Sequence, residues 1–201
     1  IKIGNRSGHS GKGTLSIDEF KLPVEWTPEG AVIQKEISCG KTAKPWDEFT
    51  PVVRHVELEL KGSEVHDRLS VTYGFRDIAT EVDKFVLNGS PIFFRGTTES
   101  RAFPGTGFPP TEVGPWKDLM RTCHAYGLNH IRFDSWCPPE AAFSAADELG
   151  LYLAVEVGTA PAQGDGAAVR YRIEETRKIL AQYGNHPSFI LLTTGEAIAG
   201  T

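Results

Sequence analysis

The stretch His186-Pro-Ser-Phe-Ile-Leu-Leu-Thr-Thr-Gly-Glu196 decides the fold that the sequence predicts. Its apolar run from Phe189 to Leu192 shows no alternation, and Thr-Thr-Gly closes it. Such a run is typical of a strand that is buried on both faces, as in a parallel sheet. Glu196 is the next charged residue, so it follows the carboxyl end of this strand. In barrels of alternating strands and helices, that end carries the chemistry.

Three more pairs of strand and helix precede this strand. Short apolar runs alternate with segments whose apolar residues recur at helical spacing. This order, with short connections, predicts a parallel sheet with right-handed crossovers. Four such units are half of an eight-fold barrel, which takes about 250 residues in all. We expect strands at 92–96, 129–133, 151–155 and from 189 onward. We expect helices from the cap Thr111 to 126, with Pro115 in the first turn, and at 140–149 and 169–183.

Glycine and proline mark the ends of these helices. Gly127 and Gly150 follow the first two helices as C-terminal stops, and Pro138 and Pro139 open the second. The third helix has an amphipathic pattern. Its residues on one face are Val169, Ile173, Thr176, Leu180 and Tyr183.

The same topology also fits an open, four-stranded, flavodoxin-like sheet. No glycine-rich phosphate loop follows the first strand, which argues against nucleotide binding. An α/β domain unrelated to any barrel and fused to a β-sandwich is a further alternative.

Residues 1–72 have the pattern of an all-β domain. Val56-Glu-Leu-Glu-Leu60 alternates apolar and charged residues, as a half-exposed antiparallel strand does. Turn-forming clusters such as Ser10-Gly-Lys-Gly13 and Trp26-Thr-Pro-Glu-Gly30 separate the candidate strands. This spacing predicts a β-sandwich of immunoglobulin type. The candidate strands are residues 1–3, 14–17, 31–37, 52–60 and 68–73.

Residues 73–91 form a connector with a predicted hairpin. Asn88-Gly89 lies between the apolar runs Phe85-Val-Leu87 and Pro91-Ile-Phe-Phe94, a strong hairpin signal. The second run continues into Arg95-Gly96, which places the first barrel strand at about 92–96. The predicted fold is therefore all-β plus α/β. It has an immunoglobulin-like β-sandwich at 1–72, the connector at 73–91, and the N-terminal half of a (β/α)8 TIM barrel at 92–201.

The composition of the 201-residue chain is that of a globular protein, with 40% hydrophobic and 23% charged residues. A net charge of −5 without a Lys/Arg stripe argues against a nucleic-acid partner. No stretch has the length of a membrane span, and the start Ile1-Lys-Ile-Gly4 lacks a signal-peptide pattern. Because the chain does not begin with Met, we expect a fragment or a processed start. The location is then periplasmic or extracellular if a signal peptide was removed, and cytoplasmic otherwise.

The cysteines give no sign of a metal or redox site. Cys39, Cys123 and Cys137 form no C-x-x-C motif and cannot all be paired, so buried thiols are expected. His124 points to a different side of the helix from Cys123, which argues against zinc. We expect neither a metal nor a cofactor.

Acidic residues follow the predicted strands at their carboxyl ends. Asp134 comes after the second strand, Glu156 after the third and Glu196 after the fourth. Parallel strands place these ends on one face, so the acids should converge in space. One acid alone is better explained as a helix cap or an arginine partner, and the prediction rests on their number. Clustered acids raise one another's pKa, which suits a general acid at neutral pH.

Other side chains join this group. Glu99 and Arg101 follow the first strand, and Arg132 lies near the end of the second. Trp136, close to Asp134, offers an apolar platform for a sugar ring, with packing against the second helix as the equal alternative.

Six motifs occur in the order in which glycoside hydrolase family 2 has them. The chain resembles this family, the group of β-galactosidases, β-glucuronidases and β-mannosidases, over roughly residues 70–197. That family places an immunoglobulin-like domain before its barrel, which fits the predicted sandwich. The motifs are Tyr73-Gly-Phe-Arg76, Phe85-Val-Leu-Asn-Gly89, Phe94-Arg-Gly96, Tyr126-Gly-Leu-Asn-His-Ile-Arg132, Ala146-Asp-Glu-Leu-Gly150 and Asn185-His-Pro-Ser188.

The resemblance implies retaining hydrolysis of a β-glycosidic bond in a carbohydrate substrate. In the family the acid/base glutamate follows the fourth strand in a Gly-Asn-Glu motif, and the nucleophile follows the seventh. Two carboxyls about 5 Å apart then act together, one protonating the leaving oxygen and one forming the glycosyl-enzyme. Glu196 is the candidate acid/base, and Arg132 matches the family's active-site arginine. The candidate substrate-binding residues are Arg132, Asp134, Trp136, Glu156, Glu99 and Arg101.

The sequence departs from the family pattern at the acid. Strict alignment of Gly195-Glu196-Ala197 puts Glu196 on the family's asparagine and Ala197 on its acid. A slip of one residue restores Glu196 as the acid, but without the neighbouring asparagine. Asp134 stands where relatives often have histidine. Strands five to eight and the nucleophile are not among these residues, so we expect the chain alone to be inactive.

The alternative is a non-catalytic carbohydrate-binding or assembly module, a truncated relative in which half the barrel serves as a scaffold. Ala197 at the acid position motivates this alternative. A half barrel leaves the edges of its first and fourth strands open, which predicts a homo-oligomer.

Overall fold

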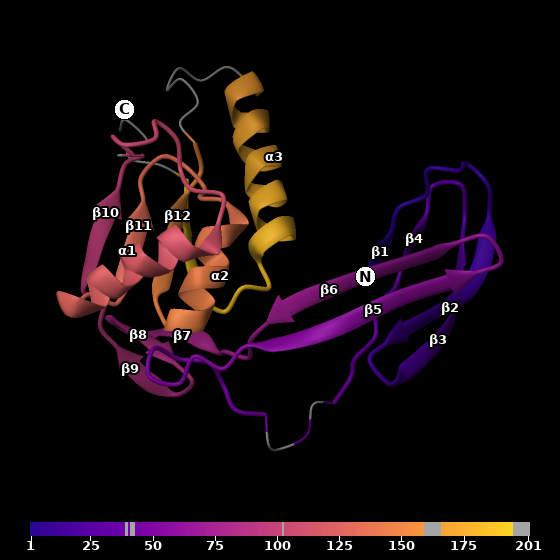
Figure 1. Ribbon diagram of the computed structural model, residues 1–201, viewed down its shortest axis with the longest axis horizontal. Helices are drawn as coiled ribbons and strands as arrows, with labels where there is room; N and C mark the ends of the chain where they lie inside the picture. The colour runs from indigo at the N-terminus through magenta and orange to yellow at the C-terminus, as the bar shows by residue number, and fades with distance from the viewer. Residues whose placement is uncertain (39, 41–42, 102, 159–165, 195–201) are drawn as a thin grey trace. The chain divides into compact units, whose positions relative to one another are not determined.

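In the computed structural model the chain forms two compact units, which Figure 1 shows as ribbons. The β unit comprises residues 1–43 and 54–73, and the α/β unit comprises residues 44–53 and 74–201. The structure describes residues 1–38, 40, 43–101, 103–158 and 166–194. The short segment 44–53 thus belongs to the α/β unit although β-unit residues flank it on both sides.

The β unit is built on a four-stranded antiparallel sheet in the order β3-β2-β5-β6. β2 (Gly11–Ile17) pairs with β3 (Phe20–Trp26), and β5 (Arg54–Gly62) pairs with β6 (His66–Tyr73). A second, two-stranded sheet consists of β1 (Lys2–Ile3) and β4 (Ala31–Val32).

One face of the four-stranded sheet carries the core of the β unit. Leu15 lies opposite Leu22 and Leu60 on the neighbouring strands, so the three side chains share this face. Trp26 packs directly over Gly11, where an added Cβ would lie 2.5 Å from the indole ring. The buried residues of this core are Leu15, Ile17, Val24 and Trp26, and Ile3, Ala31, Ile33 and Ile37 pack against them.

The strands of the β unit differ from the prediction in two places. The sequence prediction lacks β3, whose Pro23 lowers the strand signal. Proline is tolerated there because β3 lies at the edge of the sheet, where a missing N–H needs no partner. The predicted strand at 31–37 is limited to β4 (Ala31–Val32).

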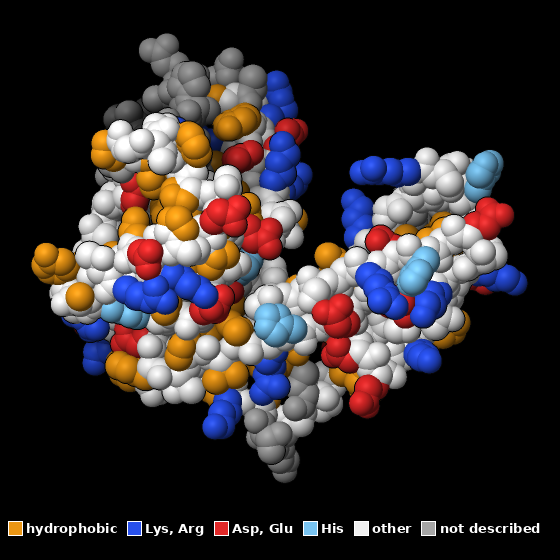
Figure 2. Space-filling view, in the orientation of Figure 1, with side chains coloured by type: hydrophobic (Ala, Val, Ile, Leu, Met, Phe, Trp, Pro, Cys, Tyr) orange, Lys and Arg blue, Asp and Glu red, His pale blue; other side chains and the backbone are white. Residues whose placement is uncertain are grey.

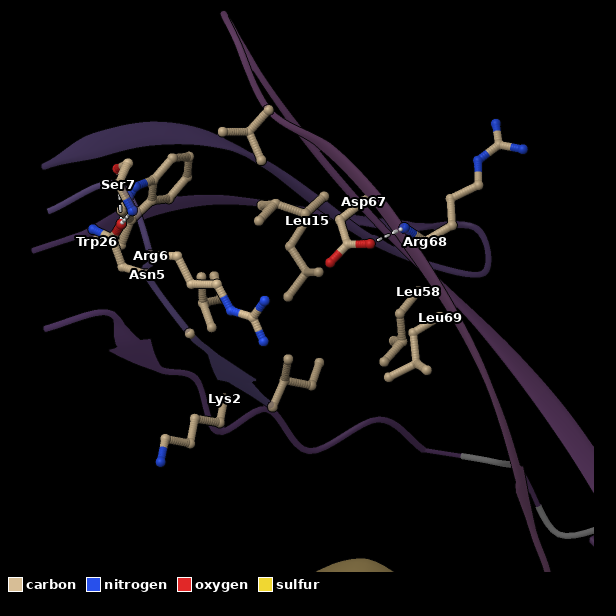
Figure 3. A pocket seen from close by; sticks show the side chains of 15 residues that line it. Lys2, Asn5, Arg6, Ser7, Leu15, Trp26, Leu58, Asp67, Arg68 and Leu69 are labelled. Carbon is tan, nitrogen blue, oxygen red and sulfur yellow. Dashed lines mark hydrogen bonds between the residues drawn. The ribbon is translucent and has the colours of Figure 1, made fainter. Parts of the chain in front are cut away.

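An open groove of about 750 Å³ lies beside this core. Figure 3 shows Leu15, Leu58 and Leu69 in its lining, with the Arg6 side chain extending into it. Leu69 is 58% exposed, so the apolar lining reaches solvent. This groove belongs to the β unit, whereas the predicted site residues that the structure describes belong to the α/β unit.

The α/β unit contains a parallel sheet in the order β10-β11-β12-β13, which is also the order in sequence (Figure 1). The predicted alternation of strands and helices is confirmed. The strands are β10 (Gly96–Glu99), β11 (His130–Phe133), β12 (Tyr152–Glu156) and β13 (Phe189–Thr193), and the helices are α1 (Val113–Ala125), α2 (Glu140–Leu149) and α3 (Gly166–Tyr183).

The three helices share one hydrophobic core with the sheet. Trp116 of α1, Phe143 of α2 and Ile179 of α3 pack in the same cluster as Phe133 and Val155 of the sheet. A doubly wound sheet has a reversal in strand order and helices on both faces. The described residues show a sequential order and one shared helix core, so the flavodoxin-like alternative is not supported.

The predicted hairpin is confirmed, but the first parallel strand was predicted in the wrong place. β7 (Ile78–Glu81), β8 (Lys84–Leu87) and β9 (Ser90–Ile92) form a separate antiparallel sheet. Asn88 and Gly89 both have positive φ, 52° and 79°, as a type I′ turn requires. The parallel strand is β10 (Gly96–Glu99) rather than 92–96, because Ile92 already belongs to β9.

Only part of the apolar face that the sequence groups on the third helix packs in the core. Tyr183 packs against the core and stacks on Phe143, with 4.4 Å between the ring centroids. Val169 is 54% exposed, Ile173 46% and Leu180 49%, whereas Ile179 is 4% exposed and lies in the core. The helix therefore turns a second apolar stripe to solvent, beside the basic side chains that Figure 2 shows along α3.

A second core of the α/β unit, the Trp46 cluster, lies around the segment 44–53. Trp46 is fully buried, and its Nε1 donates to the Asp147 carbonyl at 2.7 Å. Its ring meets Tyr152 edge to face at 5.7 Å. The cluster consists of Trp46, Leu87 and Tyr152, with Val53, Ile78, Ile92, Phe94 and Ile190 packed against them.

His130 borders the Trp46 cluster at the start of β11. Its Nδ1 lies 3.0 Å from the Tyr152 carbonyl, and its ring lies 5.0 Å from Phe94. Burial lowers the pKa of His130, and the hydrogen bond to Tyr152 opposes this shift only in part. The neutral imidazole is therefore the form that the fold prefers.

We expect the α/β unit to lose stability as the pH falls below about 6.5, the ordinary pKa of an imidazole. The pKa is lower in the folded state, so the unfolded state takes up the proton first. The free energy of unfolding then decreases as the pH falls between the two pKa values. Urea denaturation of the parent and His130→Gln at pH 7.5 and pH 5 should show a smaller loss in the variant.

His124→Gln is the matched control, because His124 is exposed on α1. It should keep the full pH-dependent loss of the parent. If His130→Gln also keeps the full loss, His130 is not the group responsible.

Candidate active site

Arg132 and Glu156 form an ion pair between two neighbouring strands. Arg132 lies on β11 beside Ala154 of β12, and Glu156 is the last residue of β12. The Arg132 Nη2 donates to Glu156 Oε2 at 2.7 Å. The Glu156 side chain is 1% exposed, whereas that of Arg132 is 34% exposed. The pair thus holds a guanidinium at the carboxyl ends of the strands, on a side chain that is about one-third exposed.

Asp134 joins this pair from the loop that follows β11. Its Oδ1 lies 4.0 Å from the Arg132 Nη2, and its side chain is 37% exposed. Ser100, which follows β10, donates its hydroxyl to Asp134 Oδ2 at 3.3 Å. The loops after β10 and β11 and the end of β12 therefore meet around one guanidinium.

Glu99 organises the other side of the group. Its carbonyl accepts from the Asp134 N–H at 3.0 Å and from the Trp136 Nε1 at 3.2 Å. Its carboxylate accepts from the backbone N–H of Arg101 at 3.0 Å. The Arg101 Nη2 donates in turn to the carbonyl of Ser135.

Trp136 is 8% exposed, and its ring is held in an aromatic cluster. It meets Phe133 edge to face at 5.3 Å and Phe103 at 6.0 Å. In this structure the indole anchors the loop after β11, and its role as a platform for a sugar ring stays a prediction.

Two residues of these loops have backbone conformations that are unusual for their type. Arg101 and Ser135 both have φ of 62°, in the left-handed region that favours glycine. The two residues also contact each other, as described above. Strained backbone of this kind costs about 1–3 kcal/mol per residue and tends to gather at functional sites. Its occurrence in both loops supports a functional assignment for this edge of the sheet.

Six of the seven predicted site residues therefore come together at one edge of the parallel sheet. Glu196, the seventh, lies outside the described residues. β13 ends at Thr193, which is the register partner of Glu156, so the fourth strand ends beside the ion pair. The sequence prediction did not include Ser100 and Ser135. In the sequence, these two serines are marked only by their position next to Glu99 and Asp134.

The two cysteines that the structure describes have thiols of low reactivity. Burial raises the pKa of the Cys123 thiol, and burial together with the charge of Glu175 raises that of Cys137 to about 12. Both are free thiols in the structure, and Cys39 lies outside the described residues. Within the described ranges, no three His, Cys, Asp or Glu side chains are grouped to hold a metal ion. Among the helices of those ranges, none has the length and apolar character of a membrane span.

No protein-family model matches the sequence. Among curated proteins, a β-galactosidase of Thermoanaerobacterium thermosulfurigenes is 25% identical over 191 residues, which cover 95% of this chain and 26% of that protein. A β-glucuronidase of Mus musculus is 23% identical over 192 residues, covering 87% of this chain and 29% of that protein. The chain thus spans about a quarter of the length of these relatives.

Solved structures share the fold of the chain. A family 2 β-galacturonidase from Eisenbergiella tayi, bound to galacturonate, matches with a TM-score of 0.81 at 20% identity, over 94% of this chain and 36% of that one. An exo-chitosanase from Amycolatopsis orientalis matches with a TM-score of 0.80 at 16% identity, over 95% of this chain and 25% of that one. The resemblance to glycoside hydrolase family 2 is confirmed. The homologues of the chain are glycoside hydrolases that act on β-glycosides. The chain has the fold of the corresponding part of these enzymes.

We expect Arg132→Met to destabilise the α/β unit, because it leaves the Glu156 carboxylate buried without this partner. Breaking a fully buried pair costs about 3–5 kcal/mol. Arg132 is one-third exposed, so solvent screening lowers the expected loss to roughly 1–3 kcal/mol. The double variant Arg132→Met, Glu156→Gln should recover much of this loss, because it removes the buried charge.

Urea denaturation measures these differences, with Arg121→Met as the matched control. Arg121 forms an exposed pair with Asp118 on α1, and its loss should change the free energy of unfolding by less than about 1 kcal/mol. Equal losses in the two arginine variants would contradict a structural role for the pair between Arg132 and Glu156.

Proposed function

We propose that this chain supplies the first part of a retaining β-glycosidase of the family 2 type. The observation that carries the proposal is the site at the carboxyl ends of the parallel strands, where Arg132, Asp134, Glu156 and Glu99 are held together. In barrels of this architecture the catalytic residues come from the carboxyl ends of several strands. The relatives by sequence are glycosidases that act on β-linked sugars.

The proposed architecture is an immunoglobulin-like β-sandwich followed by half of a TIM barrel. Two features support the half barrel. In the described residues, β10 and β13 each pair on one side only, and the four strands follow one another in sequence order. The exposed stripe of Val169, Ile173 and Leu180 on α3 is of the kind that a neighbouring helix covers in a complete barrel.

In the proposed reaction, Glu196 protonates the leaving oxygen and later activates water. A second carboxylate forms the glycosyl-enzyme. The family resemblance places this nucleophile after a seventh strand, so it would come from a part of the barrel beyond the four units described here. Glu196 follows β13, which ends beside Glu156.

The other site residues would bind and orient the sugar. Arg132 is held in place by Glu156 on a side chain that is about one-third exposed, and it would contact the sugar there. Asp134, half-exposed next to it, would accept hydrogen bonds from sugar hydroxyls. Glu99 and Arg101 would shape the loop after β10, and Trp136 would fix the loop after β11.

A non-catalytic carbohydrate-binding or assembly module remains the second candidate. The observation that favours it is Ala197 at the position of the family's acid under strict alignment. In that case the site at the strand ends would bind a sugar without cleaving it.

We expect the 201-residue chain alone to turn over no 4-nitrophenyl β-glycoside, because the retaining mechanism needs two carboxylates. In the protein that the complete reading frame encodes, Glu196→Gln should lower kcat/KM for alkyl β-glycosides by about 10²–10⁴, the usual contribution of general acid catalysis. The loss should be much smaller for 2,4-dinitrophenyl glycosides, whose leaving group needs little protonation.

Ala197→Gly is the matched control and should leave both rates near those of the parent. An unchanged rate in Glu196→Gln would remove Glu196 from the mechanism. Binding of β-linked oligosaccharides by calorimetry without any turnover, in the chain and in the complete protein alike, would favour the binding module over the glycosidase.

We also expect the isolated chain to self-associate. The exposed apolar stripe of α3 and the open edges of β10 and β13 both favour contact with another copy. Ile173→Glu with Leu180→Glu should shift the species seen by sedimentation velocity toward the monomer. Arg177→Glu, a change of an exposed residue on the same helix, should shift it less. A parent chain that is monomeric at all concentrations would contradict the expectation.

A further inference from the structure

A buried carboxylate holds the residues directly before β13. Asp147 of α2 is fully buried, and its Oδ2 lies 2.6 Å from the Nδ1 of His186, which is 4% exposed. Its Oδ1 accepts from the backbone N–H of Ser188 at 3.0 Å. One carboxylate therefore fixes both a side chain and a backbone group of the segment 186–189, which precedes and begins the strand.

An arginine from the connector holds the same segment from another side. The Arg76 Nε donates to the carbonyl of Pro187 at 2.7 Å, and its Nη2 donates to the carbonyl of Phe189. Gly74 lies so close to Pro187 that an added Cβ would be 2.6 Å from the proline ring. Burial lowers the pKa of Arg76, and the charge of Asp147 opposes this shift. We call Arg76, Asp147 and His186 the entry clamp.

The clamp lies directly before an irregularity in the sheet. Leu153 of β12 pairs with Phe189, but the next residue, Ala154, pairs with Leu191. Ile190 is thus an extra residue in β13, and the later pairs, Val155 with Leu192 and Glu156 with Thr193, are displaced by one position. A regular strand that starts at the same pair would place Leu191 beside Val155 and Leu192 beside Glu156.

Register in a strand decides which side chains face each side of the sheet. A slip of one residue exchanges the two faces, because side chains alternate with a period of two. The extra residue interrupts the ladder of hydrogen bonds, and the packing of Ile190 against the Trp46 cluster offsets part of that cost. A fixed start for the strand adds to this packing in holding the irregular pairing.

We propose that the entry clamp sets the shifted register of β13, and that Arg76, Asp147 and His186 are positioning residues for the end of this strand beside Glu156. Asp147 and Arg76 act on backbone groups at positions 187–189, one residue before the extra Ile190. The motifs Ala146-Asp-Glu-Leu-Gly150 and Asn185-His-Pro-Ser188 thereby gain a joint role that lies outside the site itself.

The consequence for catalysis rests on the proposed function. In the regular register Leu192 would stand beside Glu156, and Thr193 and every later residue would lie one position further along the sheet. If Glu196 acts after β13, a loss of the shift would therefore move it relative to the ion pair of Arg132 and Glu156.

Cysteine pairs across β12 and β13 can report the register without any substrate. Val155→Cys with Leu192→Cys joins partners in the observed register, and neighbouring strands lie close enough for a disulfide. Val155→Cys with Leu191→Cys joins partners only in the regular register, because Leu191 otherwise faces the opposite side of the sheet from Leu192. Mild oxidation and peptide mapping give the ratio of the two specific bridges.

We expect Asp147→Ala and Arg76→Met to lower this ratio by about tenfold or more, since each removes contacts to buried backbone groups at the strand start. Asp147→Asn keeps the size of the side chain and Arg76→Lys keeps its charge, so both should lower the ratio less. They replace the stronger variants if those fail to fold. Glu148→Gln is the matched control. Glu148 is the next residue of α2, its carboxylate is exposed and paired with Lys117, and the ratio should stay at the parent value.

A merely stabilising role would lower the melting temperature in the clamp variants while the ratio stays unchanged. That result, in folded Asp147→Ala or Asp147→Asn, would overturn the proposal. Because the readout is a disulfide ratio, it stands or falls independently of any glycosidase activity.

Discussion

Parallel pairing in sequence order is the constraint on which the site depends. Each of β11 to β13 lies beside the strand that precedes it in the chain and runs parallel to it, so the carboxyl ends of all four strands lie at one edge. Residues that are about 25 positions apart in sequence, such as Arg132 and Glu156, are thereby brought to 2.7 Å. The one-sided helix layer makes this possible, because it leaves the other face of the sheet to the inward-facing side chains.

Much of the α/β unit can be predicted from sequence because its signals are local. α2 (Glu140–Leu149) ends at Gly150 with φ of 77°, and the glycine marks this end unambiguously. The Asn88-Gly89 turn likewise needs positive φ at both positions. In both cases a backbone conformation selects the residue type, so the residue type reveals the conformation.

The structure differs from the sequence prediction where tertiary packing overrides a local pattern. The run Ile92-Phe-Phe94 has the composition of a buried strand, yet Ile92 and Phe94 are used in the Trp46 cluster and the parallel strand begins only at Gly96. On α3 the apolar residues outnumber those that one face can bury, so periodicity alone does not tell which stripe meets the sheet. The sequence could not predict the hydrogen bonds around Glu99 for another reason. They depend on its backbone carbonyl, which carries no sequence signature.

The segment that carries Trp46 makes both units discontinuous in sequence. The chain leaves the β unit after residue 43, inserts an indole into the interior of the α/β unit and re-enters the β unit at residue 54. Neither unit is therefore a continuous piece of the gene. A single proteolytic cut cannot release one of them whole, and a shortened version that begins at Gly74 would have an unfilled hollow where the indole sits. During synthesis, Trp46 emerges about a hundred residues before Asp147 and Tyr152, so it can be buried only after they have been made.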